Sequence, residues 1–241
     1  SSVKTIGENV FEKCPNLTDI NVLPKNAYYS SENGILFDKS KTTLICCPPV
    51  KQGEFSVPKS ITRINSDAFS YCDRLTGITL PETVSYIGSG AFKYCSALKN
   101  INLPYGIDAI NKNTFASCKA LEKIDIPNNV KIIDTSAFLN CSALGSINIP
   151  ESVTQIGNNA FYSCSSLQFA ILPENLSTIS ARTFSNCKAL TTINIPDGVT
   201  EIGEAAFFGC TVLNNVMIPV SVTAIGINAF ANCTSITDIY Y

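Results

Sequence analysis

Residues 81–103 read PETVSYIGSGAFKYCSALKNINL, and this unit recurs along most of the chain. The clearest marker of the repeat is its first residue, and that proline occurs at Pro58, Pro81, Pro104, Pro127, Pro150, Pro173, Pro196 and Pro219. The spacing is 23 residues at every interval, with no insertion or deletion. A fixed period of this length indicates a solenoid, in which each unit buries its apolar face by stacking on its neighbours.

The end of the unit has the pattern of a short strand. Ile101 and Leu103 alternate with Asn100 and Asn102, which predicts that the two apolar side chains point inward and the two amides outward. Pro104 then ends the strand, because proline has no backbone N–H to donate.

The middle of the unit has a different spacing. Phe92, Cys95 and Leu98 are three residues apart, which predicts a tight helical turn with one buried face. A turn is also expected after the second isoleucine of each unit. The position holds residue types that tolerate positive φ or begin a helix, namely Gly7, Asn65, Gly88, Asn111, Asp134, Gly157, Ser180, Gly203 and Gly226.

Parallel stacking of such units places each inward side chain on its own copy, about 4.8 Å away along the stack. We therefore expect a curved single domain of about ten coils whose strands form one parallel sheet. The regular coils occupy residues 58–241, and residues 1–23 form a first partial repeat. Both ends of the chain read as cut, because each falls within the repeat, so the absence of a signal peptide or membrane anchor from this fragment argues nothing about secretion.

One stretch departs from the period. Residues 24–57 form an elongated repeat in which two short apolar runs, 34–37 and 44–47, surround a polar segment. This arrangement predicts a hairpin between Ile35 and Cys47, and we expect antiparallel pairing nowhere else.

Written as Leu-x-x-Ile-x-Leu-Pro-x-x-Val-x-x-Ile-Gly-x-x-Ala-Phe-x-x-Cys, the unit resembles the BspA-like leucine-rich repeat, the Treponema pallidum type of that superfamily. The resemblance covers essentially the whole chain. It implies an α/β repeat solenoid, a right-handed leucine-rich-repeat coil with a parallel sheet of short strands on the concave face and short helical turns elsewhere. It also implies an extracellular or cell-surface protein with a role in adhesion, and it supplies no catalytic residues.

Composition argues against several classes of function. With 17 basic and 19 acidic residues, the chain has no excess of positive charge for binding nucleic acid. Its longest apolar runs are far shorter than the roughly 20 residues needed to span a bilayer, so this fragment is not expected to insert directly into a membrane. There is no histidine and no phosphate-binding loop or nucleophile motif. We predict no enzymatic activity, no catalytic residues and no cofactor.

Cysteine recurs once per coil and forms a regular column. The column has eight members, which are Cys72, Cys95, Cys118, Cys141, Cys164, Cys187, Cys210 and Cys233. Cys14 precedes them and is grouped with them. Because this phase is shared with the Phe and Leu columns, we expect buried, reduced thiols that pack as small hydrophobes. Bridges between coils and a thiolate metal site are the weaker alternatives, because parallel Cβ vectors do not favour disulfide geometry and no C-x-x-C pair is present. Cys46 and Cys47 are expected on opposite faces of a strand, with a vicinal bridge as the alternative.

The outward strand positions are where a ligand would bind. They are Gly77/Thr79, Asn100/Asn102, Lys123/Asp125, Ser146/Asn148, Phe169/Ile171, Thr192/Asn194, Asn215/Met217 and Asp238/Tyr240. Phe169 and Ile171 are two large apolar residues among polar neighbours, and Met217 and Tyr240 extend the anomaly. With Asn148, Thr192, Asn194 and Asn215 as a polar rim, this set is the predicted binding site.

The preferred function is non-enzymatic recognition of a protein or surface glycan by a monomer. Two alternatives stay open: a structural stalk that displays another domain, and an accessory module that binds carbohydrate. A stalk predicts uniformly polar outward positions, whereas a binding protein predicts an apolar or aromatic patch.

Overall fold

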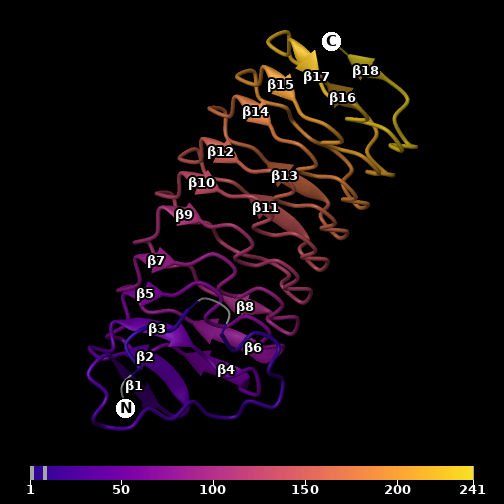
Figure 1. The fold of residues 1–241 in the computed structure, drawn as a ribbon. Coiled ribbons are helices and arrows are strands. Elements are labelled where there is room, and N and C mark those ends of the chain that lie inside the picture. The colour runs from indigo at the N-terminus through magenta and orange to yellow at the C-terminus, as the bar shows by residue number, and fades with distance from the viewer. Residues whose placement is uncertain (1–2, 8–9, 241) are drawn as a thin grey trace.

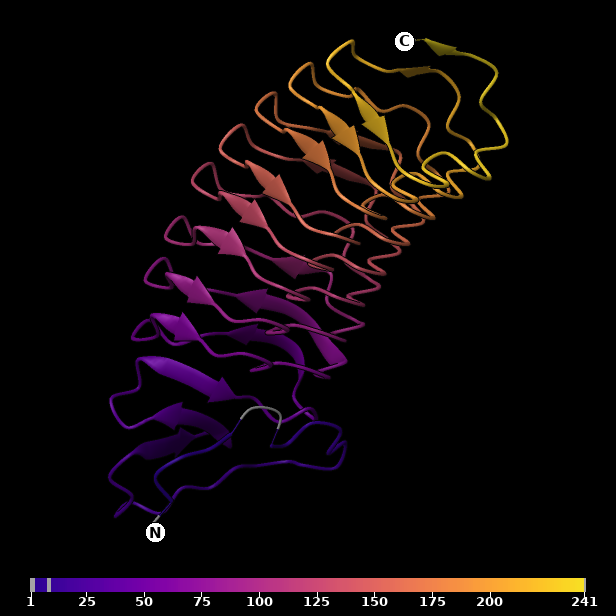
Figure 2. The ribbon, with the colours of Figure 1, turned by 45° about the horizontal axis from the view of Figure 1, so that its top comes forward.

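The computed structural model describes residues 3–7 and 10–240, which form an elongated stack of coils (Figure 1). The chain runs from one end of the stack to the other, so the two termini lie at opposite ends (Figure 2). One core extends through the stack, with its buried residues running from Ile35 to Cys233. The solenoid that the 23-residue period predicts is thus confirmed.

Each regular coil has two strand positions, so the prediction of a single parallel sheet is wrong. The first strand column follows the Leu-x-x-Ile-x-Leu pattern and contains β4 (Gln52–Ser56), β6 (Arg74–Thr79), β8 (Asn100–Ile101), β11 (Ser146–Asn148), β13 (Phe169–Ile171), β16 (Val216–Met217) and β18 (Ile239–Tyr240). The second strand column precedes the turn and contains β3 (Thr43–Cys46), β5 (Arg63–Ile64), β7 (Tyr86–Ile87), β9 (Ala109–Ile110), β10 (Ile132–Ile133), β12 (Gln155–Ile156), β14 (Thr178–Ile179), β15 (Glu201–Ile202) and β17 (Ala224–Ile225).

Pairing within both columns is parallel, and it is in register apart from a bulge between Gly53 and Glu54 of β4. In the second column Ile133 lies beside Ile110 on one side and Ile156 on the other, so each isoleucine packs on its copy in the next coil. In the first column Ala170 of β13 lies opposite Ile147 of β11. The two columns of arrows run side by side along the stack (Figure 1).

The third side of each coil consists of turns, and no residue that the structure describes is helical. The expected helical turns are therefore wrong, although Phe92, Cys95 and Leu98 are all fully buried as predicted. The reason is a division of the backbone hydrogen bonds. The Cys95 N–H donates to Phe92 O within the turn, but the Phe92 N–H donates to Thr114 O of the next coil. Such alternation prevents both the consecutive i→i−3 bonds of a 3₁₀-helix and the i→i−4 ladder of an α-helix.

Two residues per coil adopt left-handed backbone conformations that also break a helix. In residues 81–103 they are Gly90 (φ 65°) and Tyr94 (φ 62°). The turn begins after the second isoleucine as expected, but Gly88 itself has no positive φ. A Cβ on Gly88 would lie 2.4 Å from the backbone nitrogen of Ser66, so this glycine is required by the close approach of the preceding coil.

The elongated repeat contains the predicted hairpin. The strands β2 (Ile35–Asp38) and β3 pair antiparallel. The strand β1 (Tyr29–Glu32) also pairs antiparallel with β2, so the expectation that antiparallel pairing would be confined to Ile35–Cys47 is wrong. Because β3 then pairs in parallel with β5, the antiparallel strands extend the second column toward the N-terminus.

Candidate functional site

The outer face of the first strand column carries the predicted binding residues. Phe169 and Ile171 at the two ends of β13 are 49% and 55% exposed, while Ala170 between them is buried. Their expected outward direction is confirmed. The parallel register places Ser146 beside Phe169 and Asn148 beside Ile171. The next coil carries Thr192 and Asn194 at the equivalent positions, and both are exposed.

The C-terminal part of the same face repeats this contrast. Met217 on β16 is 70% exposed and lies in register with the exposed Tyr240 of β18. Asn215 is exposed just before β16. The coil of Asn194 separates Ile171 from Met217, so the structure yields two apolar pairs with a polar coil between them. The role of these eight residues in binding stays a prediction.

The N-terminal part of this face is hollowed. A depression of about 480 Å³ lies over β6 and β8, and Gly77, which follows Glu54 and precedes Asn100 in the outward column, places no side chain in it. Its lining also includes Lys123 and Asp125. The sequence shows that Gly77 is smaller than Glu54 and Asn100 at the equivalent positions. Whether a depression forms there depends on the side chains of the neighbouring coils, which the sequence pattern does not place.

The cysteines of the regular column have a structural role. Every cysteine of the chain is free, and all eight members of the regular column are buried. From Cys95 to Cys233, each thiol donates to the carbonyl of a phenylalanine one coil earlier, at 3.0 to 3.2 Å. Burial raises the pKa of Cys164 to about 12, so at neutral pH this thiol is protonated and available as a donor.

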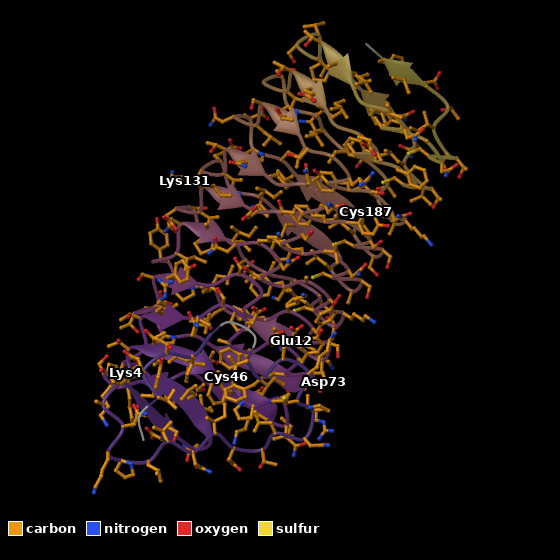
Figure 3. The ribbon with its side chains drawn as sticks, in the orientation of Figure 1. Lys4, Glu12, Cys46, Asp73, Lys131 and Cys187 are labelled. Atoms are coloured by element: carbon orange, nitrogen blue, oxygen red, sulfur yellow. The ribbon has the colours of Figure 1, made fainter. Side chains whose placement is uncertain are left out.

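Cys46 is the last residue of β3 and lies near the indigo end of the stack (Figure 3), and Cys47 follows it in the chain. Cys47 is buried and Cys46 is half-buried, as expected for neighbours on opposite faces. Burial, reinforced by Cys47 and Cys14, raises the pKa of Cys46 to about 12. No group of three His, Cys, Asp or Glu side chains suited to a metal ion is found within residues 3–7 and 10–240.

The Asp38 carboxylate stabilises a turn. Asp38 accepts from the backbone N–H groups of Thr42 and Thr43, at 2.8 and 2.7 Å, and from the hydroxyls of Ser40 and Thr42. Although burial opposes ionisation, these hydrogen bonds lower the pKa of Asp38. The four donors come from the β2–β3 connection and the first residue of β3, so the arrangement closes a hairpin.

The structure adds one region that the sequence pattern did not reveal. On the turn side, away from both strand columns, a hollow of about 570 Å³ contains Tyr162, Ser185 and Phe208. In Figure 3, Cys187 marks the turn side and Lys131 marks the side of the second strand column. The sequence does contain a signal for this hollow, because the three residues occupy the same position in successive repeats and the middle one, Ser185, is much smaller than the other two.

The part of the chain that the structure describes contains no helix able to cross a membrane.

The comparisons with known proteins agree with the architecture. The model of the BspA type leucine-rich repeat region matches residues 1–51, 46–168 and 155–241, with six copies. No curated protein matches the chain.

Several solved structures are similar. A leucine-rich repeat protein from Bacteroides ovatus is 27% identical, with a TM-score of 0.65 over 88% of this chain and 68% of that one. The T. pallidum leucine-rich repeat protein is 23% identical, with a TM-score of 0.66 over 90% and 91%. A leucine-rich cell surface protein from Faecalibacterium prausnitzii is 23% identical, with a TM-score of 0.50 over 90% and 86%.

Proposed function

The chain belongs to the BspA-type leucine-rich repeat family, and from this premise we propose that it is a non-enzymatic recognition protein that binds a protein partner. The repeats of this family are generally not enzymes. Solenoids present extended surfaces to macromolecules, because each coil contributes one row of outward residues. The F. prausnitzii relative is described as a cell surface protein, which supports a surface or secreted location for this chain as well.

The observation that carries the proposal is the exposure of Phe169 and Ile171 among polar neighbours in the first strand column. An apolar anchor of this kind, with amides and hydroxyls around it, has the composition of a protein interface. Asn148, Thr192 and Asn194 form the polar edge. Met217 and Tyr240 form a second apolar pair farther along the same face. A structural stalk predicts uniformly polar outward positions, so the apolar patch favours binding over a purely structural role.

The test is an array of purified extracellular-matrix proteins and glycans probed with the chain. We expect binding to protein spots, and the double substitution Phe169→Ser with Ile171→Ser is expected to weaken that binding at least about 30-fold, as for loss of an interface hot spot. Ile132→Ser on the second strand column is the matched control, because Ile132 is also exposed. Unchanged affinity in the double variant, or a large fall in its melting temperature, would refute the proposal. Binding to glycans alone would favour the carbohydrate-binding alternative.

A further inference from the structure

The hollow on the turn side contains two aromatic residues with a small residue between them. Tyr162 and Phe208 occupy the same position two coils apart, and Ser185 occupies that position in the coil between them. Ser185 is only 2% exposed, whereas both aromatic residues are half-buried. A small residue between two aromatic residues leaves the space of one missing side chain.

The width of that space suits a single saturated ring. Successive coils are separated by about one strand spacing, so positions two coils apart lie roughly 10 Å from each other. Carbon atoms in contact are about 3.5 to 4.0 Å apart. A ring with contacts on both of its faces therefore fills most of the separation. The negative face of an aromatic ring favours the weakly positive C–H groups that a sugar ring presents.

The polar groups around the hollow are available to a ligand. The Tyr162 hydroxyl and the side-chain amides of Asn159, Asn186 and Asn228 make no hydrogen bond to any residue that the structure describes. Each amide offers two donors and an acceptor, and the phenol offers both functions. Such groups match the vicinal hydroxyls of a sugar.

The charge balance argues for a neutral ligand. Arg182 and Glu204 both line the hollow and form an ion pair with each other. Since the guanidinium is already paired, the site offers no unbalanced positive charge to a phosphate or a carboxylate. We propose that this hollow binds a neutral pyranose residue of a glycan, with Tyr162 and Phe208 against the ring and the asparagine amides on its hydroxyls.

The site is independent of the proposed protein-binding face. It lies on the turn side, where Tyr162 and Phe208 directly follow the buried Phe161 and Phe207, whereas Phe169 and Ile171 lie on β13. The two can therefore be tested separately. The double substitution at Phe169 and Ile171 is expected to leave sugar binding unchanged.

The probe is a panel of free neutral hexoses and N-acetylhexosamines, with sialic acid as the charged member, measured by saturation-transfer NMR and titration calorimetry. We expect at least one neutral sugar to bind and sialic acid to bind more weakly. Tyr162→Ala and Phe208→Ala should each reduce affinity about tenfold or more. Tyr162→Phe keeps the ring and removes only the hydroxyl, so its loss should be smaller.

Tyr105→Ala is the control, because Tyr105 is 65% exposed and does not line the hollow. Melting temperatures of all variants show whether a loss reflects unfolding, and Tyr162→Phe keeps the test valid if either alanine variant fails to fold. The proposal is overturned if no neutral sugar binds, if sialic acid binds more tightly, or if Tyr105→Ala weakens binding as much as Tyr162→Ala.

Discussion

The Cys141 thiol donates a hydrogen bond to the carbonyl oxygen of Phe115, 3.1 Å away in the preceding coil. The same oxygen accepts the backbone N–H of Cys118 at 3.1 Å. From Phe69 to Phe207, each phenylalanine carbonyl in this row accepts one hydrogen bond within its own turn and one from the next coil. Alanine or valine would fill a similar volume but would leave that second position empty, which gives a physical reason for cysteine at this position.

The burial of the thiols predicts a simple labelling pattern. In the native protein a thiol reagent at neutral pH should react rapidly with Cys14 alone, because Cys14 is the exposed cysteine. Cys46 should react slowly, because its pKa of about 12 leaves little thiolate. After denaturation all 11 cysteines should react. Rapid native labelling of the regular column, or fewer free thiols after denaturation, would contradict the packing described above.

The raised thiol pKa values also predict how stability depends on pH. The folded pKa of Cys164 is about 12, whereas the value without burial is 9.0. A folded pKa above the unfolded one gives stability that is fully present below pH 9 and is lost as the pH rises toward 12. In that window the loss for one such thiol is at most about 1.4 kcal/mol per pH unit.

Denaturant titrations of the protein and of Cys164→Ser, measured from pH 8 to pH 11, check this expectation. Serine keeps a hydroxyl donor at the position but does not ionise. The variant should therefore lose stability less steeply than the parent above pH 9. Equal slopes would show that ionisation of Cys164 is not linked to unfolding.

The phenylalanine ladder predicts a dependence on position in the stack. Phe138 is fully buried, and its ring centroid lies 5.4 Å from that of Phe115 and 5.3 Å from that of Phe161. Phe230 is half-buried and stacks on Phe207 at 5.2 Å, with no following phenylalanine in the ladder. Phe138→Ala should reduce the free energy of unfolding by about 3 to 5 kcal/mol, and Phe230→Ala by clearly less. Urea denaturation measures both, and equal losses would contradict stabilisation by neighbouring coils.

The repeat period gave reliable information about burial and less about backbone geometry. The three-residue spacing of Phe92, Cys95 and Leu98 correctly predicts that all three are buried. It cannot distinguish a helix from a turn whose amides bond to the next coil, because both bury every third side chain. The left-handed φ of Tyr94 is not apparent from the residue type, since tyrosine rarely adopts it.

The same difference between burial and backbone geometry explains why one of the two proposed binding surfaces could be predicted from the sequence and the other could not. On the first strand column the period of two assigns a side to every residue, so the exposure of Phe169 and Ile171 follows from the sequence. On the turn side the expected helical geometry gave no such assignment. The hollow between Tyr162 and Phe208 depends on which turn residues face outward in register across three coils, and that became visible only with the backbone path.

Close approach of neighbouring coils predicts a contrast between two glycines. A Cβ on Gly157 would lie 2.4 Å from the backbone nitrogen of Thr135, whereas a Cβ on Gly145 would meet nothing within 4 Å. The contact at Gly157 is with backbone, so an added methyl group has to push two coils apart. Gly157→Ala should therefore lower the free energy of unfolding by about 1 to 3 kcal/mol, as overpacking does.

Gly145→Ala is the matched control, and it should be neutral or stabilising by up to about 1 kcal/mol, because alanine restricts the unfolded chain. Asn111 and Ser180 occupy the position of Gly157 in other coils, where they donate to Ile87 O and Ile156 O of the preceding coil. Gly157→Asn should consequently lose less stability than Gly157→Ala, since its Cβ makes the same contact but its amide can add a hydrogen bond to the preceding coil. If both substitutions at Gly157 behave like Gly145→Ala in urea denaturation, the coils are less closely packed than the structure shows.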